Sequence, residues 1–326
     1  MMRRKAWLFV LLIWPVSAQA PSLLQRAQKA FSPLPLRMDL KNKPASPAMI
    51  ELGRHLFYEK QLSLNNTMSC NSCHDLRYGF GADGRPTSPG AVTGRGTRNA
   101  PSVYNAALHT WQFWDARSQT VEAQAGSPLT NPIEMAMPDG YEVEKRLQGI
   151  PTYRKLFAAA YPSDPQPVRY AYVMEALGAF ERGLVTPAPF DRYLEGDETA
   201  LDSQQLKGLE HFLRMGCVEC HHGPALGGSE LRKLGRKEPF VSEDRGRYQA
   251  THAAADDGVF KVPSLRNVCQ TGPYYHNGQV RKLEEAVSLM GRHECGQQLT
   301  PQEVAELCDF LTSLTGEIPK DYVSSP

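Results

Sequence analysis

The chain has 326 residues, and its 36 Lys and Arg residues nearly balance its 35 Asp and Glu residues, for a formal net charge of +1. Because the sequence has no basic run, it argues against nucleic acid as a partner. The length is sufficient for two domains of ordinary size.

Residues 1–20 have the organisation of an export signal. A basic stretch, MMRRK, precedes an apolar run at residues 6–16, and the small polar segment SAQA follows. This order is typical of a secretory signal peptide. The apolar run is shorter than the roughly 20 residues of a membrane-spanning helix, and no later segment is apolar for long enough. We therefore predict a periplasmic protein without a membrane span after cleavage; the alternative is an uncleaved anchor.

Predicted helices alternate with long loops along the rest of the chain. The loops at residues 78–101 and 126–140 are rich in Gly and Pro. Helical periodicity places Val173, Leu177, Phe180 and Leu184 on one stripe of segment 167–184. A second helix, 203–216, leads to Cys217. A third helix begins with a capping box of Thr300 and Glu303 and has Pro301 in its first turn. It is predicted to end at Gly316. Its apolar face carries Val304, Leu307, Leu311 and Leu314.

Two C-x-x-C-H motifs carry the chemistry of the sequence. The first comprises Cys70, Cys73 and His74, and the second comprises Cys217, Cys220 and His221. In this motif two thiols add to the vinyl groups of a haem, and the adjacent histidine binds the iron. A zinc site or a redox dithiol would leave both histidines without a role. The motifs therefore predict two covalently bound haems c.

A weak internal repeat accompanies the motifs. GRHLF (53–57) precedes the first motif, and GLEHFL (208–213) precedes the second. We therefore predict an all-α fold of two c-type cytochrome domains, each around one haem, at residues 21–185 and 186–326. The three remaining cysteines allow at most one disulfide, and the sequence leaves its pairing open; they are Cys269, Cys295 and Cys308.

Together with the haem motifs, segments 98–138 and 259–292 resemble the bacterial dihaem cytochrome c peroxidase family. That family includes the MauG-type enzymes, which oxidise tryptophan residues of a partner protein. The resemblance extends from about residue 47 to residue 316. It implies that the N-terminal haem reacts with peroxide and that the C-terminal haem accepts electrons.

The resemblance also implies roles for residues near the N-terminal haem. Glu134, in the segment Asn-Pro-Ile-Glu-Met, matches the distal glutamate that moves a proton between the peroxide oxygens. Gln124 matches a distal glutamine, and Trp114 matches a tryptophan between the haems. Without the resemblance, Glu134 would be read as a solvated loop acid and Trp114 as a core aromatic.

For the C-terminal haem, the resemblance implies that Met290 is the sixth iron ligand, opposite His221. A thioether ligand raises the reduction potential. In MauG-type enzymes this ligand is a tyrosine, so the methionine is a peroxidase trait. Calcium between the haems would be held by Asn99 and by the carbonyl oxygens of Thr271 and Pro273, because calcium prefers hard oxygen ligands.

The sequence departs from many of these peroxidases after the first haem motif. They carry a histidine there that binds the resting iron, whereas residues 75–108 contain none and His109 lies at a different place. We therefore predict an N-terminal iron that is five-coordinate or water-bound at rest, a trait of MauG-type enzymes. His222 must point away from the iron because it is adjacent to His221. Three other histidines are expected to be ordinary residues: His55, His211 and His293.

These features predict a dihaem peroxidase that reduces hydrogen peroxide to water with electrons from a small cytochrome c or a cupredoxin. The first alternative is a MauG-type enzyme that oxidises residues of a partner protein. The second is a dihaem electron carrier without catalysis. The sequence leaves the oligomeric state open, with a homodimer as one option.

Overall fold

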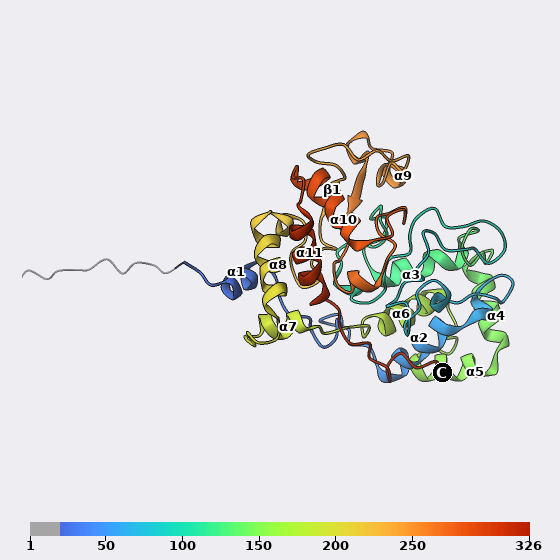
Figure 1. Ribbon diagram of the computed structural model, residues 1–326. Helices are drawn as coiled ribbons and strands as arrows, with labels where there is room; N and C mark the ends of the chain where they lie inside the picture. The colour runs from blue at the N-terminus through green and yellow to red at the C-terminus, as the bar shows by residue number, and fades with distance from the viewer. Residues whose placement is uncertain (1–19) are drawn as a thin grey trace, which may run out of the picture.

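The computed structural model describes residues 20–326, so the predicted signal segment lies almost wholly outside the described residues. The described chain is mainly helical (Figure 1). Its α-helices are α1 Leu23–Ala30, α2 Pro47–Tyr58, α3 Val121–Thr130, α4 Gly140–Gly149, α5 Pro151–Ala160, α6 Tyr170–Glu181, α7 Pro189–Leu194, α8 Ser203–Arg214, α9 Tyr248–Thr251, α10 Leu283–Met290 and α11 Pro301–Thr312.

One short antiparallel ribbon accompanies the helices that the sequence predicts. It pairs β1 Leu231–Lys233 with β2 Val259–Lys261, with Leu231 opposite Lys261. None of the helices between residues 20 and 326 combines the length and the apolarity that crossing a bilayer requires.

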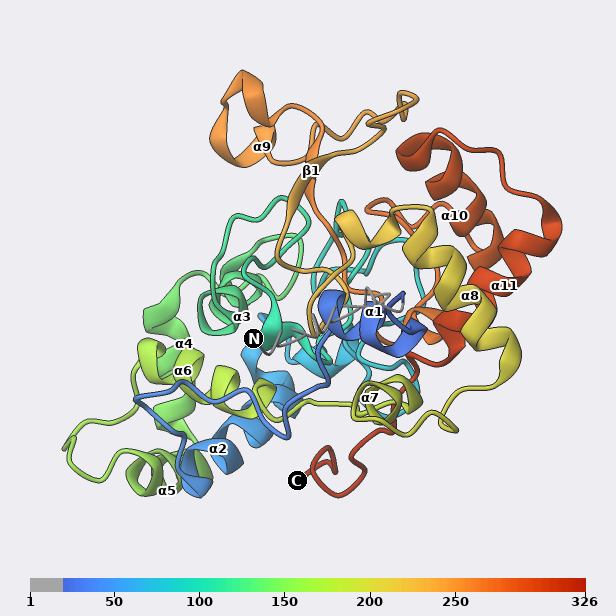
Figure 2. The same cartoon turned by 90° about the vertical axis from the view of Figure 1, so that its left-hand side faces the viewer.

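Two large apolar clusters form the core, beside a small group made of Tyr275, Val280 and Ala286. The first is built mainly on α2, α5 and α6, and the second on α7, α8 and α11. Figures 1 and 2 show α8 and α11 side by side, apart from α2 and α6. Each cluster contains the side chains that the helical periodicity predicts, including the stripe on α6, which is fully buried.

The two ends of the described chain pack on the half to which they do not belong in sequence. Phe31, just after α1, contacts Phe190 of the second cluster with ring centroids 5.4 Å apart. Conversely, Tyr322 stacks on Phe180 of the first cluster at 5.1 Å. The two ends of the described chain therefore pack across the predicted division at residue 185.

The weak sequence repeat corresponds to two equivalent helix crossings. Gly53 of α2 lies against α6, and a Cβ built on Gly53 would be 1.9 Å from the carbonyl oxygen of Ala176. Gly208 of α8 lies against α11, and its Cβ would be 1.9 Å from the carbonyl oxygen of Glu306. Each helix pair packs closely only because glycine has no side chain at the crossing.

A second repeat, which the sequence analysis did not find, joins the two halves. It consists of APSVYN (100–105) and VPSLRN (262–267). Asn105 and Asn267 both have left-handed backbones, with φ of 60° and 59°. Their side-chain amides both donate to Oγ1 of Thr186, each at 2.9 Å. Thr186 therefore fixes the two repeats to each other.

Each repeat continues into a closed loop and a helix. The loop 112–118 is closed by the hydrogen bond from Gln112 N to Ser118 O, and the loop 274–280 by that from Tyr274 N to Val280 O, both 2.7 Å. The helices α3 and α10 follow. Trp114 and His276 occupy corresponding positions in the loops, and their rings meet edge to face at 6.3 Å.

The capping box predicted for the last helix is confirmed. The Thr300 hydroxyl accepts a hydrogen bond from Glu303 N, and Pro301 is the first helical residue. The predicted end at Gly316 is wrong, because α11 ends at Thr312 and the chain turns at residues 313 and 314. Gly316 is needed for close packing instead, since a Cβ there would be 2.0 Å from Thr186 O.

Replacing Gly208 by Ala should destabilise the protein by about 1–3 kcal/mol, because the added methyl group overlaps the backbone of α11. The measurement is thermal unfolding of the haem-loaded protein followed by circular dichroism. Gly149→Ala is the control, since a Cβ at this exposed helical position has no neighbour within 4 Å. Equal stability of the two variants would contradict the close crossing of α8 and α11.

Candidate functional site

Two cavities among residues 20–326, one around each C-x-x-C-H motif, bring the predicted site residues together. The N-terminal cavity is lined by Cys70, Cys73, His74, Trp114, Gln124 and Glu134. The C-terminal cavity is lined by Trp114, Cys217, Cys220, His221, Lys261 and Met290. The structure thus gathers all the predicted catalytic and haem-binding residues around these two cavities.

The two motif histidines are held in the same way. Nδ1 of His74 lies 3.1 Å from the carbonyl oxygen of Gly81, and Nδ1 of His221 lies 3.1 Å from that of Leu226. Burial lowers the pKa of both imidazoles, that of His221 to about 4, so both rings are neutral. A neutral ring that donates through Nδ1 leaves Nε2 free to bind a metal.

Both cysteine pairs lie on short 3₁₀ turns, Cys70–Ser72 and Cys217–Glu219. His74 N donates to Cys70 O at 2.9 Å, and His221 N donates to Cys217 O at 3.0 Å. Each turn therefore presents two thiols and one imidazole to a single cavity. All seven cysteines are free thiols, so none of the three remaining cysteines is in a disulfide.

Glu134 reaches the N-terminal cavity from the turn that follows α3. The turn is closed by the hydrogen bond from Glu134 N to Asn131 O at 3.0 Å, and Asn131 Nδ2 donates to Glu134 Oε1 at 3.0 Å. Burial raises the pKa of the Glu134 carboxyl, although Arg117 and Asn131 oppose the shift. Gln124 of α3 lines the same cavity, and its amide makes no hydrogen bond to residues 20–326. The cavity thus combines an acid and an amide that can serve a small polar substrate.

Trp114 lines both cavities. Its indole Nε1 donates to Asn99 O at 2.9 Å, and its own carbonyl accepts from Lys261 N at 2.8 Å. These bonds fix the ring between the two halves, where the resemblance implies a tryptophan.

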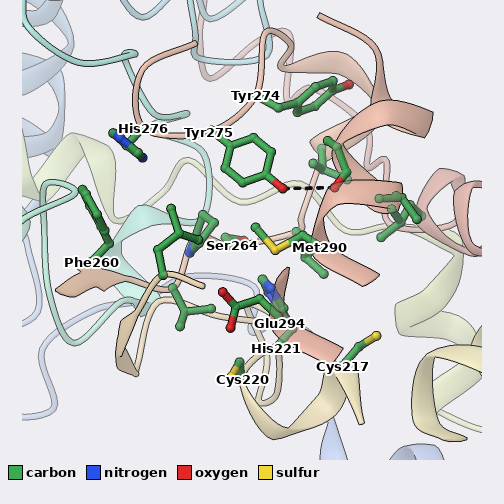
Figure 3. A pocket seen from close by; sticks show the side chains of 18 of the residues that line it. Cys217, Cys220, His221, Phe260, Ser264, Tyr274, Tyr275, His276, Met290 and Glu294 are labelled. Carbon is green, nitrogen blue, oxygen red and sulfur yellow. Dashed lines mark hydrogen bonds between the residues drawn. The ribbon is translucent and has the colours of Figure 1, made fainter. Parts of the chain in front are cut away.

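Met290 lies at the end of α10, where the chain continues as a π-helical turn, Gly291–Cys295. Figure 3 shows Met290 and His221 pointing into the same cavity from different elements. The cavity thus offers one imidazole and one thioether to a metal.

The predicted calcium residues, Asn99, Thr271 and Pro273, all line the C-terminal cavity. Asn99 Nδ2 donates to Arg85 O at 2.8 Å, which leaves its Oδ1 as an oxygen ligand. Within residues 20–326 no three His, Cys, Asp or Glu side chains cluster as a metal site. Calcium would therefore depend on amide and carbonyl oxygens.

The other histidines do not enter the N-terminal cavity, where His74 is the only histidine among the described lining residues. His109 lies against Gly228 and lines the C-terminal cavity instead. Nε2 of His222 lies 3.5 Å from a carboxylate oxygen of Glu230. The three other histidines that are predicted to be ordinary residues also have partners nearby. His55 contacts Glu51, His211 contacts Glu306, and His293 contacts the carbonyl of Glu238.

Sequence reasoning missed Lys261 of β2. Its side chain is 4% exposed, lines the C-terminal cavity and has no hydrogen-bond or ion-pair partner among residues 20–326. Burial lowers the pKa of its amine to about 8. A buried amine needs an anionic partner, and a haem propionate would supply one. The residues that line this cavity therefore suit a haem. Only the second repeat, which begins directly after Lys261, could have drawn attention to it.

This geometry defines a dihaem protein, and the chain belongs to the dihaem cytochrome c peroxidase family. Residues 47–199 match the family model described as "Di-haem cytochrome c peroxidase".

Among its relatives, the chain is 42% identical over 310 residues to cytochrome c551 peroxidase of Pseudomonas aeruginosa, with 93% of this chain and 89% of that protein covered. It is 34% identical to methylamine utilization protein MauG of Methylorubrum extorquens, over 85% of this chain and 81% of that protein. Among solved structures, a MauG-like protein associated with microbial copper homeostasis matches with a TM-score of 0.80 and 30% identity, over 90% of this chain and 97% of that chain. The relatives named peroxidases are haem oxidoreductases, and this chain is an enzyme of that kind.

The raised pKa of Glu134 gives a test of its electrostatic environment. A carboxylate that acts as a base loses activity as the pH falls through its pKa. Arg117 lowers the pKa of Glu134, so Arg117→Gln should move the acid limb of the profile of kcat/KM for peroxide to higher pH. Arg154→Gln, on the exposed face of α5, should leave the profile unchanged. An unmoved limb in Arg117→Gln would refute the coupling.

Proposed function

We propose that this chain is an exported, periplasmic dihaem peroxidase that reduces hydrogen peroxide to water with electrons from a small cytochrome c or a cupredoxin. The observation that carries this proposal is the difference between the cavities. The N-terminal cavity places Glu134 and Gln124 together with His74, whereas the C-terminal cavity offers both His221 and Met290. One cavity suits a reacting substrate, and the other suits electron transfer.

The proposed cofactors are two haems c, one in each cavity. Cys70 and Cys73 would attach the first, and His74 would bind its iron. Cys217 and Cys220 would attach the second, and His221 and Met290 would bind its iron. The haems supply the iron-centred redox chemistry. We propose one c-type cytochrome domain around each haem, residues 21–185 and 186–326, joined at Thr186.

In the N-terminal cavity, Glu134 would move a proton within the bound peroxide. The carboxylate would accept a proton from one peroxide oxygen and return it to the other, which would leave as water. The hydrogen bond from Asn131 to Oε1 holds the carboxyl in place. The Gln124 amide, which has no other partner among the described residues, would orient the peroxide.

Electrons would pass from the C-terminal to the N-terminal cavity beside Trp114, which lines both. Its position is fixed by its bonds to Asn99 and Lys261. Calcium bound by Asn99, Thr271 and Pro273 would hold this contact region together.

The second candidate is a MauG-type enzyme that oxidises residues of a partner protein. The absence of histidine from residues 75–108 favours it, because the resting N-terminal iron would then be accessible without prior reduction. Met290 favours the peroxidase. Turnover with a reduced cytochrome, compared with modification of a co-purified partner, distinguishes the two.

Glu134→Gln should lower the rate of peroxide reduction by about 10²–10⁴-fold, because it removes the proton carrier while keeping the shape of the side chain. The rate is measured as oxidation of a reduced cytochrome c by peroxide. Both haems should stay attached, as a pyridine haemochrome assay would show. Glu142→Gln, an exposed change on α4, is the control. Turnover of Glu134→Gln equal to that of the control would exclude this role.

The resting ferric protein should contain one high-spin and one low-spin haem. Met290→Leu, which removes the sulfur at nearly constant volume, should convert the low-spin haem to high spin. Met174→Leu, in α6 and outside both cavities, should not. Two low-spin haems in the wild type would instead indicate that a sulfur of the N-terminal cavity, from Met68 or Met135, binds its iron.

A further inference from the structure

The N-terminal cavity contains a second carboxyl that the proposed mechanism does not use. Glu181, the last residue of α6, is 4% exposed and lines this cavity together with Cys70 and His74. Within residues 20–326 its carboxyl has neither a hydrogen bond nor an ion pair. A buried acid without a partner is costly, so a position of this kind beside a cofactor cavity indicates a function.

The charged groups around Glu181 leave it uncompensated. On its own helix, the guanidinium of Arg182 is engaged by Glu122 of α3, with bonds of 2.8 and 3.0 Å. From the C-terminal tail, the Tyr322 hydroxyl donates to Phe180 O at 2.6 Å. The Tyr322 hydroxyl also accepts a hydrogen bond from Arg37 at 3.1 Å, and the thiol of Cys70, a further titratable neighbour, would be consumed by haem attachment.

Burial, reinforced by the negative charge of Glu122, raises the pKa of Glu181 to about 8. The positive charge of a ferric haem in the same cavity would lower this pKa, and reduction of the haem would remove that charge and raise it again. At neutral to mildly alkaline pH, proton binding by Glu181 must therefore depend on the oxidation state of the haem.

We propose that Glu181 is the proton acceptor coupled to reduction of the N-terminal haem, an inference that rests on the proposed function. When one electron reaches the ferric haem, the Glu181 carboxylate binds one proton from solvent, so the net charge of the cavity is unchanged. When the electron passes on to peroxide, the proton is released. Peroxide reduction consumes two electrons and two protons, and Glu181 brings one of these protons into the cavity with an electron.

Glu181 and Glu134 have different tasks in this scheme. Glu134 accepts a hydrogen bond from Asn131 and moves a proton within the substrate. Glu181 lies on α6, has no such bond, and is close enough to Cys70 to raise the pKa of its thiol. It therefore acts on the haem through charge and not through contact with peroxide.

The test is the pH dependence of the midpoint potential of the N-terminal haem, measured by spectroelectrochemistry on the full-length haem-loaded protein. In the wild type, the potential should fall as the pH rises through the range around 8. The equilibrium constant for reduction should change by nearly tenfold per pH unit. For one electron, this corresponds to a slope of the midpoint potential of about 59 mV per pH unit. Glu181→Gln should abolish this slope, and Glu181→Asp should retain it.

The matched control is Glu175→Gln, the same substitution on α6 at a residue that pairs with Lys43 outside the cavity. It should keep the wild-type slope, and so should Glu134→Gln. An unchanged slope in Glu181→Gln, or a slope lost in Glu134→Gln alone, would overturn the proposal.

Infrared difference spectroscopy of the wild type provides a second readout if Glu181→Gln fails to bind haem. Reduction should produce the C=O band of a protonated carboxylic acid, shifted in Glu181→Asp; absence of the band would overturn the proposal. A wild type without covalent haem or peroxide turnover would refute the proposed function itself. An active enzyme with a pH-independent potential would refute only the role of Glu181.

Discussion

The arrangement of both cavities depends on one shared hydrogen-bond acceptor, the hydroxyl of Thr186. Asn105 and Asn267 both donate to it, each from the end of a Pro-Ser repeat. The same repeats hold the carbonyl groups that orient the two motif histidines, because Val103 N donates to Gly81 O and Leu265 N to Leu226 O. Fixing the two asparagines to one atom therefore fixes both imidazoles relative to each other and leaves Trp114 in contact with both cavities. In the proposed function, electron transfer between the two cavities would therefore need no movement of either half.

The two halves differ in how the helix after each closed loop ends, which is α3 in the N-terminal half and α10 in the C-terminal half. Helix α3 contains Pro128 and stops at Thr130, and the turn that follows brings Glu134 to the N-terminal cavity. Helix α10 runs to Met290 and continues as a π-helical turn, so a thioether faces the C-terminal cavity. A proline cannot donate a helical hydrogen bond, whereas a π-turn keeps the chain helical. The turn after α3 thus brings an acid to one cavity, whereas the end of α10 brings a thioether to the other.

The sequence was sufficient for features that depend on short-range patterns. The capping box at Thr300 and the buried stripe of α6 follow from residues three or four apart, and the haem motifs from residues within one turn. It was insufficient for features that depend on long-range packing. Gly316 was read as a helix end because the contact with Thr186 that requires it lies 130 residues away in sequence. The sequence does not reveal Lys261 or Glu181 for the same reason. Each is a charged residue whose neighbours come from distant segments, so no local pattern indicates its burial.

The acidic residues that line the two cavities differ, and this difference matches the chemistry proposed for each. The N-terminal cavity includes Glu134 and Glu181, two carboxyls whose pKa burial raises, that of Glu181 to about 8. The described lining of the C-terminal cavity has a single acid, Glu294, and this carboxylate accepts a hydrogen bond from Gly235 N at 2.6 Å. Lys261 places a cationic group there instead, which favours the reduced form of a nearby redox centre. Protons are needed only where peroxide is reduced. In the proposed function, a fold that repeats the C-x-x-C-H site but places Glu134 and Glu181 in one cavity would therefore separate proton transfer from electron uptake.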